Sequence, residues 1–384
     1  MTLCYQMDDK YEMIRTAARA FTEKEIRPVA GELEDKEEFS VELTQKMGDI
    51  GFFGMVVPEE YGGQGLDYIS YIIAVEEIAR VDGSQAATIA AGNSLGISPI
   101  DEFGSEAQRR KYLPDLCRGK TLMGFGLTEP NAGSDAGATR TTAVQEGDSW
   151  ILNGRKTLTT NANTQMTKGS IVQAVTGARP NGKPDYTCFI LENGTPGFTL
   201  NTLKRKLMWR ASNTAELFLD NCRVPNEAVL GKPGDGFKQM LATLDGGRLS
   251  IAAMGLGCAQ GAYEAALRYS KERVQFNRPI SKQQSIAFKL ADMALKIELA
   301  RNLLYKACWL CENKRPFGIE AAMSKLYCSE IAKEVADEAV QIHGGYGLFK
   351  DYDVERFYRD QRLLQIGEGT SEILRLVISR AIGC

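Results

Sequence analysis

The chain has 384 residues, of which 43% are hydrophobic and 25% are charged, and its formal net charge is −3. This length is enough for two or three domains with an ample hydrophobic core. The small net charge and the lack of a basic block argue against a nucleic-acid partner. No apolar stretch is long enough to cross a bilayer, and the first ten residues lack the basic-then-apolar layout of a signal peptide. With nine scattered cysteines, these features predict a cytoplasmic protein in a reducing compartment.

The N-terminal third of the chain is predicted to be helical. Apolar residues recur at helical spacing over residues 13–21, and further helical patterns cover residues 69–81, 86–96 and 106–116. A segment with a proline and several glycines, residues 58–65, is expected to form a surface turn between helices.

The middle of the chain has a different character. From residue 121 to about residue 230 the segments are short, rich in β-forming residues and separated by turns. Strand patterns are found at residues 150–154, 186–191 and 215–219. We expect a small antiparallel sheet here.

The last third returns to long amphipathic helical patterns, over residues 237–273, 285–313 and 319–341. Long helices joined by short loops are typical of an antiparallel bundle. The sequence therefore predicts a multi-domain α+β fold with an all-α N-terminal domain (1–120), a β-sheet middle domain (121–230) and a C-terminal four-helix bundle (231–384).

Cys308 and Cys311 have the spacing of a CxxC motif, which can serve redox or zinc chemistry. The chain has no second CxxC motif, and His343 is its single histidine. The two cysteines also lie inside a long helical pattern, where residues three apart share one face. Core packing is the favoured interpretation, and no metal site is predicted.

Glu368 lies between Gly367 and Gly369, directly before an apolar helical pattern. A glycine on each side permits a tight turn and a close approach to a ligand. Thr370 or Ser371 is a plausible N-cap of the following helix, whose N-terminus would attract an anion such as pyrophosphate. On these residues alone, a carboxylate presented to a ligand and a solvated glutamate in a capped loop remain equal alternatives.

Several motifs occur together along the chain. They are residues 125–135 (FGLTEPNAGSD), 273–284 (RVQFNRPISKQQ), 341–347 (QIHGGYG) and 358–360 (YRD), which leads into 368–373 (EGTSEI). Each motif is a modest signal, whereas all of them in this order are specific. Over essentially its whole length, the chain resembles the acyl-CoA dehydrogenase family of flavoproteins.

The resemblance implies an FAD site. Leu127 and Thr128 are expected to lie along the flavin ring, and Ser134 near the pyrophosphate and the bound acyl-CoA. Thr160 is expected to reach toward flavin N5 and O4. Across a subunit contact, the adenosine half is expected to contact Arg273, Phe276, Gln341, Gly344 and Gly345. The dinucleotide site is expected to be completed by Thr370 and Glu372.

The resemblance also implies a substrate site. Asp245 and Arg248 are expected to hold the pantetheine and the thioester end of an acyl-CoA, next to Gly367 and Gly369. Glu368 matches the catalytic base, which removes the α-proton while the thioester oxygen is held by a flavin ribose hydroxyl and the Glu368 N–H. The β-hydrogen leaves as a hydride to flavin N5, which gives a trans-2-enoyl thioester. A carboxyl group buried beside an acyl chain should have a raised pKa.

Some relatives carry the base at a different position, immediately before the arginine that matches Arg248. Here that position is Gly247, which has no side chain to act, so Glu368 is the remaining candidate. His343 is expected to be structural, because the family motif varies at its position.

Three features depart from the family pattern. The aromatic residue that usually covers the flavin is replaced by Leu158, Thr159 replaces an apolar residue, and residues 161–169 are longer and more polar than usual. Met208 stands where glycine is common, and it could line a channel, face a partner or fill the core. Gly367 stands where many straight-chain enzymes carry tyrosine, which favours a short branched or cyclic acyl group.

The family also suggests a homotetramer that passes electrons to electron-transferring flavoprotein. One alternative is the reverse reaction, an enoyl-CoA reductase in an anaerobic complex with that partner, and an oxidase is a lesser alternative. Another is a non-catalytic flavoprotein that retains the fold, which the changes at residues 158–169 would permit. The presence of Glu368, Arg248 and Thr128 argues against this last alternative.

Overall fold

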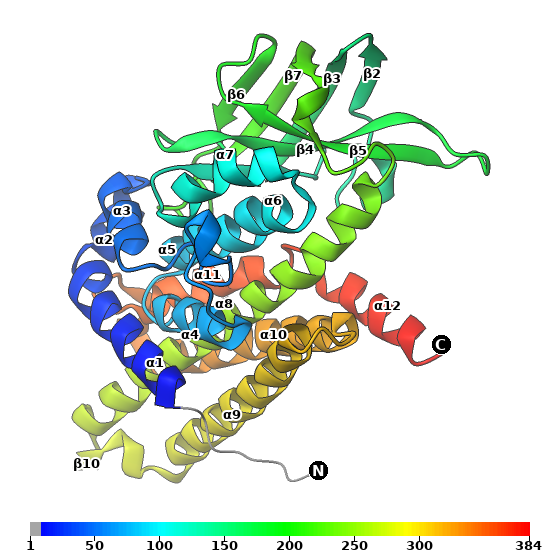
Figure 1. The fold of residues 1–384 in the computed structure, drawn as a ribbon. Helices are drawn as coiled ribbons and strands as arrows, with labels where there is room; N and C mark the ends of the chain where they lie inside the picture. The colour runs from blue at the N-terminus through cyan, green and yellow to red at the C-terminus, as the bar shows by residue number, and fades with distance from the viewer. Residues whose placement is uncertain (1–8) are drawn as a thin grey trace.

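The computed structural model describes residues 9–384, and its N-terminal part is a helical domain (Figure 1). Polar caps begin several of these helices: Ser40, Asp67 and Asp82 each accept a hydrogen bond from the backbone N–H three residues later. The helices are α1 (Asp9–Phe21), α2 (Arg27–Lys36), α3 (Val41–Asp49), α4 (Tyr68–Ala79), α5 (Gly83–Ala91), α6 (Ser98–Phe103) and α7 (Glu106–Cys117). Short π-helical turns at Thr22–Ile26 and Gly92–Ile97 link α1 to α2 and α5 to α6.

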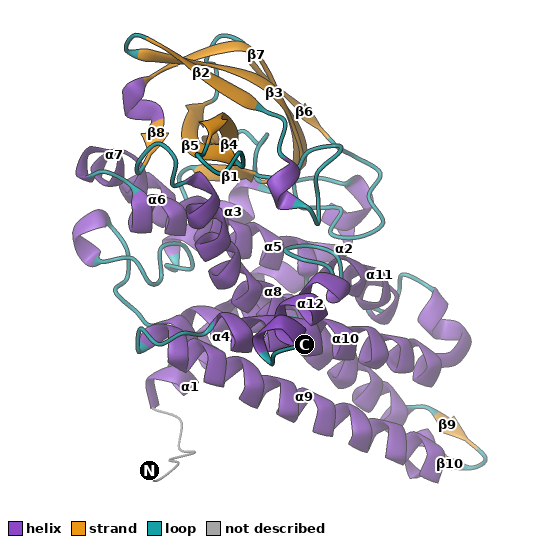
Figure 2. Cartoon of the chain, turned by 90° about the vertical axis from the view of Figure 1, so that its right-hand side faces the viewer, coloured by secondary structure: helices purple, strands orange, loops and turns teal. Residues whose placement is uncertain are grey.

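The middle part forms one sheet that lies above the helices (Figure 2). Its strands are β1 (Leu122–Gly126), β2 (Thr142–Glu146), β3 (Ser149–Thr160), β4 (Thr167–Ala178), β5 (Pro184–Glu192), β6 (Phe198–Thr202), β7 (Thr214–Pro225) and β8 (Val229–Leu230). The main path runs β6-β7-β3-β2-β4-β5-β8, and β1 pairs with β4.

The expectation of a purely antiparallel sheet was wrong, because β1 pairs with β4 in parallel and Thr142 of β2 forms a parallel bridge with Val175 of β4. The loop after β1 and the β2–β3 hairpin separate β1 from β4, and such a long crossover lets two strands run in the same direction. The three strand patterns predicted from the sequence lie within β3, β5 and β7, which confirms them.

The C-terminal part is a bundle of long helices, as predicted. It comprises α8 (Gly236–Glu272), α9 (Gln284–Glu312), α10 (Gly318–His343), α11 (Val354–Leu364) and α12 (Ser371–Ala381), with a small hairpin of β9 (Val274–Gln275) and β10 (Arg278–Pro279). In Figure 1 this hairpin projects at the end of the molecule opposite the sheet. Cys308 of α9 is buried in the bundle core, and Cys311 is partly buried beside it.

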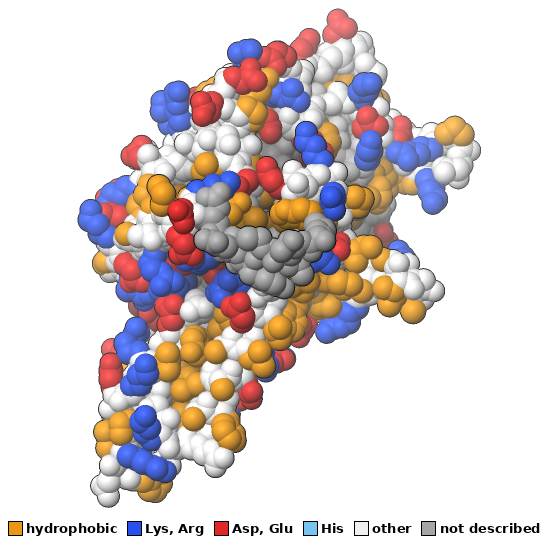
Figure 3. All heavy atoms as spheres, turned by 60° about the horizontal axis from the view of Figure 1, so that its bottom comes forward, with side chains coloured by type: hydrophobic (Ala, Val, Ile, Leu, Met, Phe, Trp, Pro, Cys, Tyr) orange, Lys and Arg blue, Asp and Glu red, His pale blue; other side chains and the backbone are white. Residues whose placement is uncertain are grey.

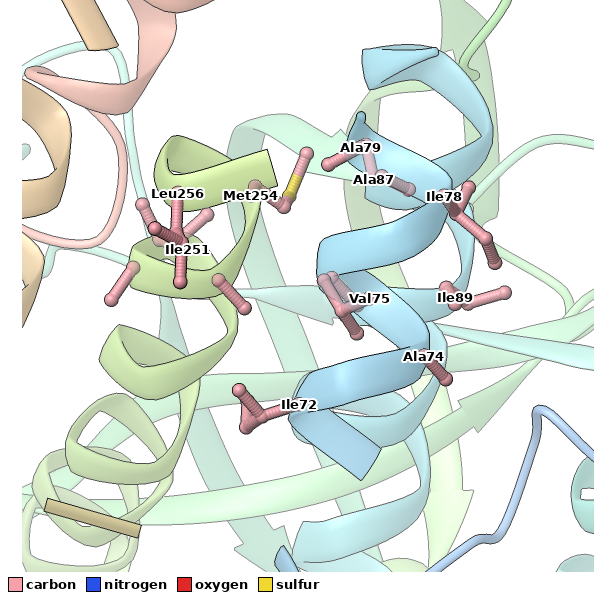
Figure 4. Close-up of a cluster of buried hydrophobic side chains, with 14 of the residues drawn as sticks. Ile72, Ala74, Val75, Ile78, Ala79, Ala87, Ile89, Ile251, Met254 and Leu256 are labelled. Atoms are coloured by element: carbon pink, nitrogen blue, oxygen red, sulfur yellow. The ribbon is translucent and has the colours of Figure 1, made fainter. Parts of the chain in front are cut away.

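Helix α8 runs through the centre of the molecule and packs against both α10 and α4. Small residues permit the approach: a Cβ built on Gly257 would lie 2.3 Å from the Glu76 carbonyl oxygen, and one on Gly261 would lie 2.1 Å from that of Arg80. The core between α4 and α8 includes the side chains of Ile72, Ile251 and Met254 (Figure 4). The helical domain and the bundle therefore share one core, on which the site is built. Across residues 9–384, no helix combines the length and the apolar character that a membrane span requires.

Candidate active site

Glu368 lies on a tight turn between α11 and α12. Its φ is +52° and that of Gly369 is +101°. Residues other than glycine rarely adopt such a positive φ. Thr370 ends the turn as the N-cap of α12, and its hydroxyl accepts a hydrogen bond from the Ile373 N–H at 3.3 Å. The predicted cap is thus Thr370 rather than Ser371. A non-glycine residue in this conformation marks a place where the fold holds a side chain in a fixed direction.

The turn places the Glu368 carboxylate directly over Gly247 of α8. A Cβ built on Gly247 would lie 1.9 Å from Glu368 Oε2, far inside van der Waals contact. The carboxylate therefore occupies the space that a side chain at position 247 would need. The two positions that the family resemblance offers for the base therefore face each other, and the Glu368 side chain fills the space between them.

The environment of the carboxylate makes it a stronger base than an ordinary glutamate. Oε2 is buried and has no hydrogen-bond partner among the described residues. Burial raises the pKa of Glu368 to about 7, although the nearby charges of Lys325 and Arg248 oppose the rise. A pKa near neutrality suits a general base, because a useful fraction of the carboxylate is ionised while its proton affinity stays high.

Arg248 and Asp245 lie one turn apart on α8. The Arg248 Nη1 donates to Asp245 Oδ1 at 2.6 Å, and Arg248 is buried. Its Nε has no partner within the described chain. Burial raises the pKa of Asp245, and the Arg248 charge opposes that rise. A buried guanidinium with a free N–H can still receive a polar group of a ligand, as the sequence predicts for Arg248.

Two further residues that the sequence did not indicate lie near Glu368. Tyr71 of α4 is buried and its hydroxyl is 2.9 Å from Ser250 Oγ of α8. Burial raises the pKa of Tyr71, and the Glu368 charge adds to the rise. Lys325 of α10 is also fully buried, and its Nζ donates to the Gly369 carbonyl at 2.6 Å. Helices α4 and α10 each carry several other polar residues, so no local pattern distinguishes these two.

The loop after β1 carries the residues expected at the flavin ring. The Thr157 N–H donates to the Thr128 carbonyl at 2.9 Å, which joins this loop to β3 and to Thr160 at the end of that strand. The side chains of Thr128 and Thr160 are partly exposed. Their hydroxyls have no hydrogen-bond partner in the part of the chain that the structure describes. Available hydroxyls on two joined segments fit a flat ring system with polar edge atoms, as a flavin has.

A buried ion pair fixes this loop. Lys156 of β3 donates to Glu129 Oε1 at 2.8 Å and to the Leu127 carbonyl at 3.2 Å, and both charged side chains are buried. The Glu129 carboxylate also accepts the Arg140 and Thr141 N–H groups, at 2.7 and 3.0 Å. These bonds hold both ends of the loop, which leaves the exposed Ser134 at its tip.

The departures from the family pattern are also visible in the structure. Leu158 has φ +57° and is 64% exposed, so an apolar side chain is presented at the position where the family resemblance implies an aromatic. The polar segment that follows is ordered by hydrogen bonds, including one of 2.7 Å from Thr167 Oγ1 to the Asn161 carbonyl. Met208 packs against the large core, which agrees with the core-filling alternative.

The residues expected at the adenosine half of FAD lie elsewhere. Arg273, Gly344 and Gly345 line a pocket of about 460 Å³ near the β9–β10 hairpin. Phe276, at the tip of that hairpin, is 88% exposed, and Gln341 lies exposed near the end of α10. Figures 1 and 2 place the hairpin and the sheet at opposite ends of the molecule. One chain therefore does not bring the two predicted halves of the FAD site together.

The last two positions lie apart: Glu372 follows the Glu368 turn, and His343 lines the pocket near the β9–β10 hairpin. Glu372 is exposed in the first turn of α12, where its own backbone N–H and the Thr370 hydroxyl lower its pKa. His343 is buried: its Nδ1 lies 2.7 Å from the Ala339 carbonyl, and its ring stacks on Tyr269 with 4.2 Å between centroids. These contacts are those of a structural histidine.

Sequence profiles of a known family match almost the whole chain. Residues 8–120 match the acyl-CoA dehydrogenase N-terminal domain, residues 124–222 the middle domain and residues 234–383 the C-terminal domain. The chain belongs to the acyl-CoA dehydrogenase family. It is an oxidoreductase of the type that acts on a CH–CH group.

Several curated relatives of this acyl-CoA dehydrogenase share similarity over nearly the full chain. The probable acyl-CoA dehydrogenase YngJ of Bacillus subtilis is 49% identical over 98% of this chain and 99% of its own. The short-chain specific acyl-CoA dehydrogenase of Clostridium acetobutylicum is 44% identical over the same shares. A subunit of the caffeyl-CoA reductase–Etf complex of Acetobacterium woodii is 42% identical over 97% of each chain.

Solved structures agree with the fold. Butyryl-CoA dehydrogenase from Megasphaera elsdenii has a TM-score of 0.95 at 43% identity, covering 99% of this chain and 100% of its own. A chain from a structure described as the electron transferring flavoprotein of Acidaminococcus fermentans has the same TM-score and coverage at 45% identity. An acyl-CoA dehydrogenase from Bacillus anthracis, solved with FAD, has a TM-score of 0.91 at 34% identity, over 98% of this chain and 67% of its own. FAD is the cofactor of the family, and the hydroxyls described above fit it.

Proposed function

We propose that this enzyme converts a short acyl-CoA thioester to its 2-enoyl-CoA by FAD-dependent α,β-dehydrogenation. One observation carries the proposal: a carboxylate with a raised pKa and an unpartnered buried oxygen, Glu368, fills the space over Gly247. A structural glutamate would be stabilised by ion pairs or hydrogen bonds instead of being left free. A free, aimed carboxylate is what abstraction of a weakly acidic α-proton requires.

In this mechanism, Glu368 removes the proton from Cα of the thioester. Arg248 and Asp245 bind the pantetheine and the thioester end, and the Glu368 N–H helps to hold the thioester oxygen as negative charge develops on it. FAD, when bound, accepts the β-hydrogen as a hydride. We assign the ring side of that cofactor to Leu127, Thr128, Ser134 and Thr160. We assign its dinucleotide end to Thr370 and Glu372, together with residues of a second subunit.

The substrate is expected to carry a short acyl group. Relatives named as short-chain specific or as butyryl-CoA dehydrogenase support this chain length. A branched or cyclic group is supported by Gly367, whose missing Cβ would touch only Leu363 at 3.7 Å or more. We infer that the missing side chain leaves room for a wider acyl group, which a tyrosine at this position would exclude.

A homotetramer is the assembly that we propose, and the divided FAD site supports an oligomer. A single FAD can reach both halves only if one half comes from a second subunit. Large apolar side chains are also exposed along α9, where Leu295 is 58% and Leu299 52% exposed. Figure 3 shows hydrophobic side chains spread along the part of the molecule that projects away from the sheet, to which α9 belongs. A second copy of the chain would cover this surface, because exposed apolar patches commonly mark such contacts.

Electron-transferring flavoprotein is the proposed electron partner. It is supported by the relative from the caffeyl-CoA reductase–Etf complex and by the similar chain from a structure described as the electron transferring flavoprotein of Acidaminococcus fermentans. The former also favours one second candidate, an enoyl-CoA reductase that runs the same step backward. We also propose that the protein is cytoplasmic. We propose three domains, over residues 1–120, 121–230 and 231–384.

The test is an anaerobic titration of the purified yellow protein with butyryl-, isobutyryl-, isovaleryl- and cyclohexanecarbonyl-CoA, followed by the flavin absorbance. We expect at least one short thioester to bleach the flavin, and octanoyl-CoA to do so far more slowly. A protein that binds FAD but is bleached by none of them would contradict the proposed dehydrogenation. If butyryl-CoA alone bleached the flavin, the proposed reaction would stand. The inference from Gly367 that the acyl group is branched or cyclic would then be wrong. The rates at which an enoyl-CoA and electron-transferring flavoprotein oxidise the reduced enzyme would separate the two directions. Faster oxidation by the enoyl-CoA would favour the reductase.

A further inference from the structure

Lys325 of α10 is among the largest side chains that are fully buried, and a buried ammonium requires a partner. Its Nζ donates a hydrogen bond to a backbone carbonyl, that of Gly369, at 2.6 Å. Burial lowers the pKa of Lys325 to about 8, and Arg248 adds to the fall while Glu368 opposes it. The Lys325 ammonium is thus placed at Gly369, the residue that follows Glu368. This is unusual, because a fully buried lysine is generally paired with an acidic side chain.

Helix α10 holds the base-bearing turn at two more points. The Ser329 hydroxyl donates to the Leu364 carbonyl at 2.8 Å, where α11 ends. The Ser371 hydroxyl donates to Glu330 Oε1 at 2.7 Å, where α12 begins. Of these three hydrogen bonds, the one from Lys325 lies closest to Glu368. The turn that they hold contains the left-handed backbone of Glu368 and Gly369. Such a conformation persists only where the surroundings determine it.

We propose that Lys325 is a positioning residue that fixes the turn through the Gly369 carbonyl and so aims the Glu368 carboxylate over Gly247. The carbonyl and the following N–H of a trans peptide point in opposite directions, so holding the Gly369 oxygen also fixes the Thr370 N–H. The inference rests on the proposed function, because it assigns Lys325 a role in presenting the base.

The same bond keeps the ammonium off the carboxylate. Neither Lys325 nor Arg248 forms an ion pair with Glu368 among residues 9–384, although both charges act on it. A direct ion pair would depress the pKa of Glu368 and weaken the base. By binding Gly369 instead, Lys325 moderates the pKa of Glu368 without quenching it. The charged groups that act on Lys325 are Glu330 of its own helix and Arg248, Glu368 and Glu372 from the neighbouring elements.

The experiment compares Lys325→Met, Lys325→Gln and Lys325→Arg in the FAD-bound enzyme. Lys333→Met is the matched control, because Lys333 is exposed on the same helix. The rate of anaerobic flavin reduction is measured from pH 6 to 9 with saturating butyryl-CoA. If another thioester of the panel above reduces the flavin faster, that thioester is used instead. We expect Lys325→Met to lower this rate at least about tenfold, since small misplacements of a catalytic group have effects of this size or larger. We also expect the apparent pKa of the pH profile to rise, because a positive charge near the carboxylate has been removed.

Lys325→Gln keeps a hydrogen-bond donor without the charge, so it should raise the apparent pKa with a smaller loss of rate, and Lys325→Arg should recover part of the rate. If Lys325→Met fails to bind FAD, the glutamine and arginine variants decide the matter by the same two readings. Wild-type rates and an unchanged pH profile in the Met and Gln variants would overturn the inference. A wild-type enzyme that no acyl-CoA reduces would instead overturn the proposed function.

Discussion

The carboxylate of Glu368 and the backbone of Gly247 are in direct contact, so that a Cβ at position 247 would lie 1.9 Å from Glu368 Oε2. The base and the glycine are 121 positions apart in the chain, yet each depends on the other. Gly247 leaves the space, and the turn at Gly367 and Gly369 carries the carboxylate into it. The first prediction follows from this contact.

Gly247→Ala should displace the carboxylate, because the added methyl group cannot share its position. We expect flavin reduction to slow by about 100-fold or more, since the base would be misplaced by an ångström or more. The matched control is Gly246→Ala, where a Cβ would meet only the Tyr68 hydroxyl at 3.7 Å. Stopped-flow reduction with both FAD-bound variants checks this. Equal rates in the two variants would mean that the carboxylate does not act from this position.

Glu368→Gln should stabilise the protein at pH 8 but not at pH 4.5. The folded protein has a raised pKa for Glu368, about 7 against an ordinary 4.5, so it binds this proton more tightly than the unfolded chain does. The stabilising contribution is therefore fully present below about pH 4.5 and is lost as the pH rises through about 7. The loss is up to about 3 kcal/mol at pH 8. Thermal unfolding of both proteins at the two pH values measures it, and a lower melting temperature of the variant at pH 8 would contradict the raised pKa.

Gly367→Tyr should narrow the acyl site. The Cβ is accommodated, because it would contact only Leu363 at 3.7 Å or more, and the ring would extend into the space beyond. We expect kcat/KM for isobutyryl-CoA to fall at least about tenfold relative to butyryl-CoA, a change of about 1.4 kcal/mol in relative transition-state binding. Gly367→Ala serves as the control and should change this ratio little. An unchanged ratio in the tyrosine variant would show that position 367 does not set the width.

Leu295→Glu combined with Leu299→Glu should break the proposed assembly. Two charges on the exposed apolar surface of α9 would have to be buried in a subunit contact, which is strongly unfavourable. We expect a smaller species by analytical ultracentrifugation, with weaker FAD retention because the proposed assembly takes half of the cofactor site from a second subunit. Val144→Glu is the control, since it places the same charge on an exposed residue of the sheet. A double variant that keeps the wild-type size and FAD content would contradict the assembly.

The sequence predicted most of the fold, because long amphipathic helices carry a repeated signal. Helix α10 was expected at residues 319–341 and spans Gly318–His343. Glu368 was predicted as the base from the glycines on both sides of it and from a family motif, and this role stays a prediction. Lys325 and Tyr71 could not be predicted, because each is one of several polar residues in its helix and is brought near Glu368 only by long-range packing. The parallel pairing of β1 with β4 was missed for the same reason, since strand direction depends on the path of the chain between them.

The rate of anaerobic flavin reduction in Glu368→Gln, compared with wild type at equal FAD content, tests the central claim most directly. Glutamine keeps the size and the position of the side chain but cannot take the α-proton. Wild type should be reduced at a rate that rises with pH through about 7, where Glu368 ionises. The variant should still bind the thioester but be reduced at least about 1,000-fold more slowly at every pH, as removal of a general base predicts. Reduction of Glu368→Gln at the wild-type rate would show that another group removes the proton.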